Sequence, residues 1–200
     1  MMGLAVSFPL PADDRNAPLD RALLVRCTAQ DPMAFRVFVA RHERAVFALL
    51  SRMLGRGPSV EDLAQETFVR AYRAFPRFDV DGPAKVSTWL LTIATRLALD
   101  ARKRREVPAT SLDDERGAPR AAATGDPEVE HRRRELGRAL EAAAATLPDD
   151  QRAALVLSEY HGLSLAEIAE ALEVPAATVK TRVFRAREKM RAALGEEWSS

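Results

Sequence analysis

The 200-residue chain has one cysteine, few aromatic side chains (6%) and only four lysines. A single thiol, Cys27, cannot form an internal disulfide or a cysteine-based zinc site. The apolar runs are far shorter than the roughly 18–20 residues that span a bilayer, and no basic segment opens a signal peptide. We therefore expect a soluble, cytoplasmic protein that does not insert into membranes.

Arginine takes the place of the missing lysine. The chain has 30 basic and 29 acidic residues, and the basic residues other than Lys85, Lys103, Lys180 and Lys189 are all arginine. Guanidinium groups bind phosphates and guanine edges bidentately, so this composition suits nucleic-acid binding. A GC-rich genome would enrich arginine and alanine codons in the same way, and the composition alone leaves both explanations open.

Helical periodicity dominates the chain, and no segment of useful length alternates as a strand does. The spacing of apolar residues and the start signals predict helices that begin at Pro32, Ser59, Ser87 and about Pro127. We predict an all-α fold.

Composition divides the chain into parts. Residues 106–130 carry seven acidic and two basic side chains, three prolines and few large apolar residues. Such a segment buries too little apolar surface to offset its ordering entropy, which predicts a flexible acidic linker. We predict a flexible tail over 1–18, a helical domain over 19–105, the linker over 106–130 and a second helical domain over 131–200.

The second domain contains a helix-turn-helix pattern. Ser164 and Glu167 have the spacing of a capping box, a turn follows at Glu173, and a longer helix begins at about Ala176. Glu173 stands where such turns commonly have glycine, because a left-handed backbone strains other residues modestly. The arrangement predicts a second helix that enters a DNA major groove.

Charge is segregated around this motif. Residues 176–191 contain six basic residues and one acidic residue, whereas residues 149–173 contain six acidic residues and one basic residue. A solvated helix could carry the same charges, but the turn and the capping box together favour DNA binding.

A second basic stretch lies in the first domain. Residues 96–105 contain five basic residues and one acidic residue, and they follow Trp89 on the same predicted helix. Basic side chains track a phosphate backbone and aromatic rings stack on unpaired bases. A core position is the favoured explanation for Trp89 taken alone, and a solvated helix end explains the basic run equally well.

Two blocks of the sequence resemble a known family. Residues 34–105 contain Asp62-Leu-Ala-Gln-Glu-Thr-Phe-Val-Arg-Ala-Tyr-Arg and Ser87-Thr-Trp-Leu-Leu-Thr-Ile-Ala, and residues 146–194 contain Gly162-Leu-Ser-Leu-Ala-Glu-Ile-Ala and Thr178-Val-Lys-Thr-Arg-Val-Phe-Arg-Ala-Arg-Glu. In this order, with a variable linker between them, the blocks resemble the two conserved regions of bacterial sigma-70 family factors of the extracytoplasmic function (ECF) group.

The resemblance implies three sets of site residues. Docking on the clamp helices of the polymerase β′ subunit would fall to Asp62, Gln65 and Glu66. Engagement of the promoter −10 element would fall to Trp89, Arg96, Arg102, Arg104 and Arg105. Binding of the −35 element in duplex form would fall to Thr178, Lys180, Thr181, Phe184 and Arg185, with Arg182 and Arg187 nearby to contact phosphates.

The implied partners are core RNA polymerase (the β′ clamp helices and the β flap), promoter DNA and an anti-sigma factor. An alternative function is a stand-alone dimeric helix-turn-helix transcriptional regulator, which explains 147–194 but leaves the Asp62 block and the linker without a purpose. We expect no enzyme, because no glycine-rich phosphate loop and no nucleophile–base pair occurs. No cofactor and no metal site is expected either, since the three histidines are scattered along the chain.

Overall fold

The computed structural model describes residues 19–55, 57–106 and 127–194. All regular elements within these ranges are helical, which confirms the predicted all-α fold. The predicted tail 1–18 and residues 107–126 of the predicted linker lie outside the described residues. The ends of the predicted linker are wrong by a few residues, because residue 106 ends one helix and residues 127–130 form the first turn of the next. The elements in chain order are α1 (Arg21–Thr28), α2 (Pro32–Leu54), α3 (Pro58–Ala74), the 3-10 turn η1 (Phe75–Arg77), α4 (Val86–Glu106), α5 (Pro127–Ala145), α6 (Asp149–Leu155), the π-helical turn η2 (Val156–Tyr160), α7 (Leu165–Leu172) and α8 (Ala176–Leu194).

Local signals fix the ends of the helices. The Asp31 carboxylate accepts hydrogen bonds from the N–H groups of Met33 (2.8 Å) and Ala34 (3.3 Å), and α2 begins at Pro32 as predicted. The start predicted for α3 is wrong by one residue. This helix begins at Pro58, because proline lacks the N–H that a first helical turn leaves unpaired, and Gly57 is its N-cap.

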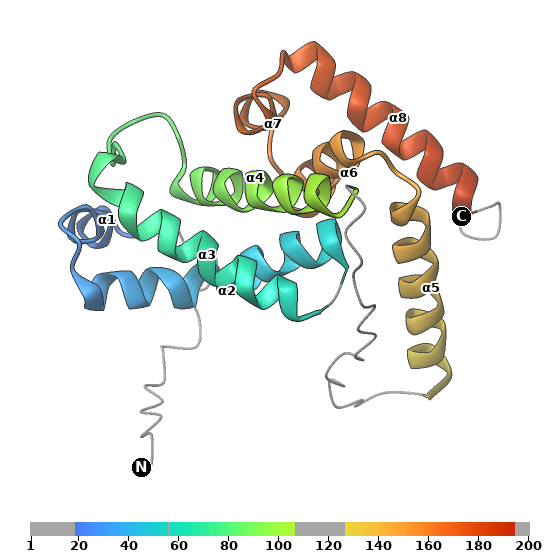
Figure 1. Cartoon of the computed structure of the whole chain (residues 1–200), viewed down its shortest axis with the longest axis horizontal. Coiled ribbons are helices and arrows are strands. Elements are labelled where there is room, and N and C mark those ends of the chain that lie inside the picture. Colours follow the sequence, from blue (N-terminus) through green and yellow to red (C-terminus); the bar gives the residue numbers. More distant parts are fainter. Residues whose placement is uncertain (1–18, 56, 107–126, 195–200) are drawn as a thin grey trace.

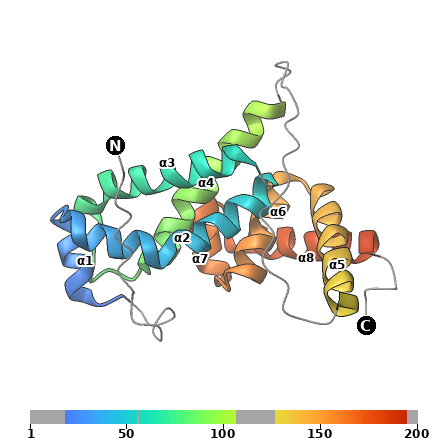
Figure 2. The same ribbon diagram turned by 90° about the horizontal axis from the view of Figure 1, so that it is seen from below.

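Helices α2, α3 and α4 form the first packed unit, with α1 at one end (Figures 1 and 2). Phe38 and Phe75 meet edge to face at 4.9 Å between ring centroids, and both are fully buried. Leu49 and Leu50 are also fully buried, and truncating either to alanine would cost about 2–5 kcal/mol of stability.

The second unit consists of α6, η2, α7 and α8, with α5 packed along α8. Its core contains Leu157, Ile168 and Val179, none of which is exposed to solvent. This core positions α8 against α6 and α7 and thereby fixes which face of α8 points outward.

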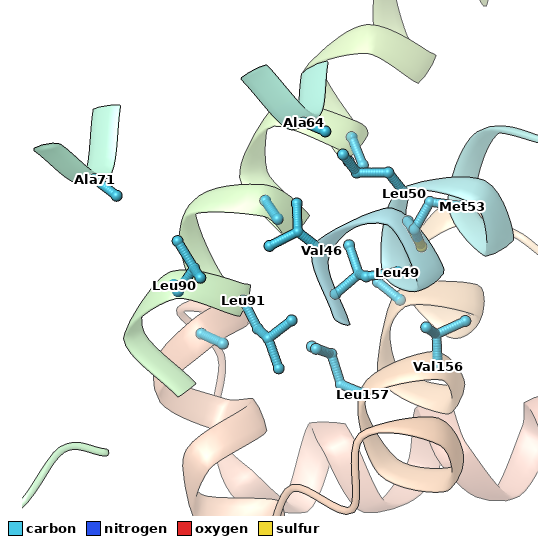
Figure 3. Packing of buried hydrophobic residues seen from close by; sticks show 14 of the residues in the cluster. Val46, Leu49, Leu50, Met53, Ala64, Ala71, Leu90, Leu91, Val156 and Leu157 are labelled. Atoms are coloured by element: carbon cyan, nitrogen blue, oxygen red, sulfur yellow. The ribbon is translucent and has the colours of Figure 1, made fainter. Parts of the chain in front are cut away.

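The two units share one continuous core. Figure 3 shows Val46 and Leu49 of α2, Leu91 of α4 and Leu157 of η2 gathered in a single cluster. Helix α7 lies against α4, so the turn of the second unit sits directly over the basic helix of the first. The sequence predicts two separate modules on a tether and does not predict this contact.

Candidate nucleic-acid interface

The helix-turn-helix has the geometry that its sequence predicts. The Ser164 hydroxyl accepts a hydrogen bond from the Glu167 N–H (3.3 Å), and the Glu167 carboxylate accepts one from the Ser164 N–H (2.9 Å). Hydrogen bonds from the Ser164 N–H and hydroxyl lower the pKa of Glu167 to about 2. The motif therefore keeps its charged cap at any physiological pH.

Glu173 forms the turn between α7 and α8. Its backbone is left-handed, with φ 54° and ψ 44°, as the glycine preference of this position predicts. The N–H of Val174 then bonds back to the carbonyl of Ala169 (3.0 Å), which closes α7 and redirects the chain into α8.

Helix α8 has a buried face and an outward face. Val179, Val183 and Ala186 recur at helical spacing and are buried. The outward face exposes four of the predicted −35 residues, which are Lys180, Thr181, Phe184 and Arg185. The Phe184 ring is 63% exposed, so it adds little to the core of this unit.

The remaining predicted −35 residues lie to the sides of α8. Arg182 is ion-paired with Asp150 at 2.9 Å, and the Nε of Arg187 donates to Glu159 at 3.2 Å. Acidic residues of the same unit therefore hold both guanidinium groups in place. Thr178 is half-buried in the first turn of α8.

Trp89 lies at an aromatic corner of the first unit. Its ring contacts Phe75 (5.1 Å between centroids) and Phe78 (5.0 Å), and it remains half-buried. An open pocket of about 270 Å³ adjoins it, bounded by Arg77, Phe78 and the loop that follows. The contacts with Phe75 and Phe78 explain why Trp89 has the spacing of a core residue. The part of its ring that remains exposed lines the pocket.

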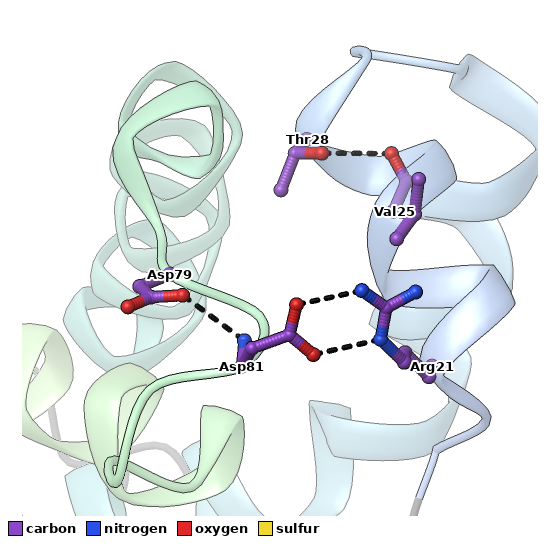
Figure 4. Close-up of polar contacts among 5 residues, drawn as sticks. All are labelled: Arg21, Val25, Thr28, Asp79 and Asp81. Atoms are coloured by element: carbon purple, nitrogen blue, oxygen red, sulfur yellow. Dashed lines mark hydrogen bonds and ion pairs between the residues drawn. The ribbon is translucent and has the colours of Figure 1, made fainter.

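The loop that closes this pocket is pinned at two points (Figure 4). Arg21 of α1 forms a two-point ion pair with Asp81 (2.7 and 2.6 Å), and this guanidinium lowers the pKa of the Asp81 carboxyl. Asp79 accepts a hydrogen bond from the Asp81 N–H at 3.0 Å. At Gly82 a Cβ atom would lie 3.0 Å from the Asp79 carboxylate, so a side chain there would displace the pocket wall.

The predicted −10 arginines extend along α4 away from this pocket. Arg96 is exposed and donates to Glu173 of the other unit at 2.8 Å. Arg102 is ion-paired with Asp149 and also donates to the Met53 carbonyl at 3.0 Å. Arg104 is exposed and bonds to its own helix, and Arg105 lies in the last turn of α4.

The predicted polymerase-docking residues lie on α3. Asp62 and Gln65 are exposed, and Glu66 is half-buried and ion-paired with Arg70 at 2.7 Å. Of the three, Gln65 lines a groove of about 560 Å³ between α2 and α3. Most of the groove wall is apolar, and it includes Phe35, Val39, Phe47, Phe68 and Tyr72.

Sequence reasoning missed the acidic residues of the second unit that contact α4. Thr88 donates to the Glu167 carboxylate at 3.0 Å, and the Lys85 ammonium lies 3.5 Å from it. The negative charge of 149–173 was visible in the sequence, but no signal there paired it with a helix some 80 residues away. Among the described residues, no three His, Cys, Asp or Glu side chains form a group that could hold a metal ion.

Comparison with known proteins assigns the family. Residues 38–107 match the family model of Sigma-70 region 2, and residues 137–190 match that of Sigma-70, region 4. The chain belongs to the sigma-70 family. It is 38% identical to the ECF RNA polymerase sigma factor SigW of Bacillus subtilis, over 82% of this chain and 90% of SigW. It is 34% identical to the RNA polymerase sigma-H factor of Pseudomonas aeruginosa, over 88% of this chain and 93% of that factor.

The structural neighbours agree with this assignment. CnrH, solved in complex with the cytosolic domain of CnrY, has a TM-score of 0.63 at 29% identity, with 88% of this chain and 96% of CnrH covered. The similarity to SigW shows that this sigma factor is a member of the ECF group, and the stand-alone regulator is not favoured. No helix in the described ranges is long and apolar enough to span a membrane.

Proposed function

We propose that this sigma factor docks on core RNA polymerase through α3, reads the −35 element with α8 and engages the −10 element with α4 and its preceding loop. In this role it directs transcription initiation and carries out no covalent chemistry itself. The outward face of α8 carries the proposal, because Lys180, Thr181, Phe184 and Arg185 are exposed side by side on a helix whose opposite face is buried.

The chemistry of this face matches the major groove. A guanidinium such as that of Arg185 can bond bidentately to the O6 and N7 atoms of guanine, and the Phe184 ring offers apolar contact to a thymine methyl group. Lys180 and Thr181 lie near the N-terminal end of α8, the end that a recognition helix directs at base edges.

The pocket beside Trp89 suits an unpaired base of the −10 element. Aromatic rings from Trp89 and Phe78 provide stacking surfaces, and Arg77 lies at the boundary to meet a phosphate. The Arg21–Asp81 pair holds the loop in place before DNA arrives, which reduces the ordering cost of binding.

Polymerase docking is proposed for the exposed face of α3 around Asp62, Gln65 and Glu66, next to the apolar groove. A helical partner that lays apolar side chains into this groove would bury Phe47, which is now 38% exposed. The second unit, with its own exposed face, is proposed to meet the β flap.

We further propose that the chain is divided into domains at 19–105 and 131–200. We also propose that it acts in the cytoplasm and that an anti-sigma factor binds it. CnrH was solved with the cytosolic domain of a second protein, CnrY, and this complex supports a protein regulator for a chain of the same architecture.

Run-off transcription with purified core polymerase tests the function. We expect that core polymerase plus this chain transcribes a subset of genomic fragments that share two spaced elements, and that core polymerase alone does not. Binding of the chain alone, as a dimer, to a palindrome, with no polymerase-dependent transcript, would support the stand-alone regulator instead.

A further inference from the structure

The loop between η1 and α4 turns sharply at its tip. The Gly82 N–H donates to the Asp79 carbonyl (3.3 Å), so residues 79–82 form a β-turn with aspartate in its first position and glycine in its last. The Oδ1 atom of Asp79 accepts from the Asp81 N–H (3.0 Å), which fixes the carboxylate relative to the turn. The loop therefore sets the direction of the Asp79 side chain.

The Asp79 carboxylate belongs to the wall of the pocket beside Trp89. Gly82 lies in the same wall, and a Cβ atom there would lie 3.0 Å from the Oδ2 atom of Asp79, so glycine leaves room for the carboxylate. An ionised carboxylate only accepts hydrogen bonds, and both oxygens keep lone pairs after Oδ1 has accepted the Asp81 N–H. The pocket thus combines aromatic faces for stacking with an acceptor for N–H groups.

The four bases differ in what their Watson–Crick edges offer such an acceptor. Guanine presents two adjacent donors, the N1–H and the 2-amino group, which match the two oxygens of one carboxylate. Cytosine and adenine each present one amino group beside a ring acceptor, and thymine presents one N–H between two carbonyl oxygens. A carboxylate therefore gains most from guanine, because two charge-assisted hydrogen bonds form in parallel, and it is repelled by the carbonyls of thymine.

Helix α1 holds the loop from the other side. Arg21 donates to both carboxylate oxygens of Asp81 (2.7 and 2.6 Å), although 60 residues separate the two in the chain. The Tyr72 hydroxyl of α3 donates to the carbonyl of Gln30, just after α1, at 3.1 Å. Both ends of α1 are therefore attached to the first unit, which limits how far the loop can move.

We infer that Asp79 is the base-selecting residue of this pocket, that it binds the Watson–Crick edge of a −10 guanine through two hydrogen bonds, and that Arg21 is its positioning residue. This inference rests on the proposed function of the pocket. Arg21 acts through Asp81, whose N–H holds the Asp79 carboxylate. Since the side chains of Arg21 and Asp81 are 65% and 66% exposed, their pair contributes less to selection than Asp79 itself.

Run-off transcription by core polymerase and the full chain, on a promoter library with randomised −10 positions, tests the selection. We expect a guanine preference of about tenfold or more over thymine at one position. Asp79→Asn keeps an oxygen for the Asp81 N–H but replaces the other acceptor by a donor. It should abolish this preference and leave the −35 preference unchanged, and a preference that it retains would overturn the inference. Glu170→Gln, the same exchange at an exposed carboxylate on α7, is the matched control.

Inosine in place of that guanine removes only the 2-amino group. With the wild-type chain the replacement should lower output about three- to tenfold, the range of one hydrogen bond. With Asp79→Asn it should have little effect, because the acceptor is gone. Equal losses with both chains would show that another group recognises the amino group and would refute the role of Asp79.

Arg21→Ala tests the positioning role. It should reduce the guanine preference up to about fivefold, the range of one exposed ion pair. Arg21→Asp combined with Asp81→Arg should restore part of the preference, because the reversed pair again joins α1 to the loop. Arg36→Ala, at an exposed arginine on α2, is the control. An even loss of output at all sequences, or no change, would contradict the positioning role of Arg21.

Oligonucleotide binding keeps this test apart from the proposed function. If core polymerase with this chain makes no transcript, the proposed function is wrong, and fluorescence anisotropy of single-stranded hexamers with guanine or inosine, titrated with the full chain, still tests the pocket. Tighter binding of the guanine hexamer that Asp79→Asn abolishes would support the inference, and equal affinities would overturn it. Transcription from two spaced elements without a guanine preference in the −10 element would leave the proposed function standing and overturn the inference.

Discussion

The two basic helices α4 and α8 carry similar charge but meet opposite surroundings. On α8, Arg182 and Arg187 are ion-paired with acidic residues of the same unit, Asp150 and Glu159. These pairs lie at the sides of α8 and leave its outward face exposed. Acidic residues of the other unit cover Arg96 and Arg102 on α4. A basic run in a sequence therefore indicates where phosphate can bind, whereas the fold decides whether that surface is free.

The largest expected difference between the two helices is the effect on stability of replacing their aromatic residues, Trp89 on α4 and Phe184 on α8, with alanine. Trp89→Ala should lower the free energy of unfolding by about 3 kcal/mol, because the ring packs against Phe75 and Phe78. Phe184→Ala should change it by less than about 0.5 kcal/mol, since that ring is 63% exposed. Chemical denaturation measures both, and a large loss for Phe184→Ala would mean that the outward face of α8 is part of the core.

Substitutions on α3 should weaken binding to core polymerase and leave DNA binding by α4 and α8 unchanged. The double variant Gln65→Ala/Glu66→Ala should weaken association with core polymerase about tenfold or more, as loss of a few central interface side chains does. Its binding to a −35 duplex should stay at the wild-type level. Arg70→Ala, which removes the ion-pair partner of Glu66, shows how much of the effect comes from that pair alone.

Acidification should destabilise the two units in parallel, because each contains one half-buried histidine. Burial, and to a smaller extent a nearby arginine, lowers the pKa of His42 and of His161 to about 4. Below pH 6.5 the unfolded chain therefore takes up protons that the folded chain does not, and stability is lost as the pH falls from 6.5 toward 4.

By pH 5.5 each histidine should account for about 1 kcal/mol of lost stability. Thermal unfolding at pH 7.5 and pH 5.5 measures this, and His42→Gln and His161→Gln should each remove part of the difference. An unchanged pH dependence in the double variant would show that other groups cause it.

Sequence periodicity and capping signals were sufficient for the helical fold and for the helix-turn-helix. Ser164 and Glu167 make the cap that their spacing predicts, because capping depends on residues within one turn. The resemblance placed the three sets of site residues on α3, α4 and α8, and the exposure of Lys180 and Arg185 was foreseeable from helical spacing.

The contact between the units was not predictable in the same way. It joins Arg96 to Glu173 and Thr88 to Glu167 across more than 70 residues, and no local rule relates such positions. The pocket beside Trp89 also depends on a distant residue, Arg21, whose pairing with Asp81 leaves no trace in local sequence patterns. Long-range ion pairs follow from the packing of the core, which the sequence pattern does not specify.

The outward face of α8 should read the −35 sequence. A promoter library with randomised −35 positions, transcribed by core polymerase with the wild-type chain, Arg185→Ala or Arg187→Ala, tests it most directly. We predict that Arg185→Ala costs about 1–3 kcal/mol and relaxes preference at one −35 position. Arg187→Ala should lower output evenly across sequences, as loss of a phosphate contact does. A uniform loss for Arg185→Ala, with the preferred −35 sequence unchanged, would mean that Arg185 does not read a base.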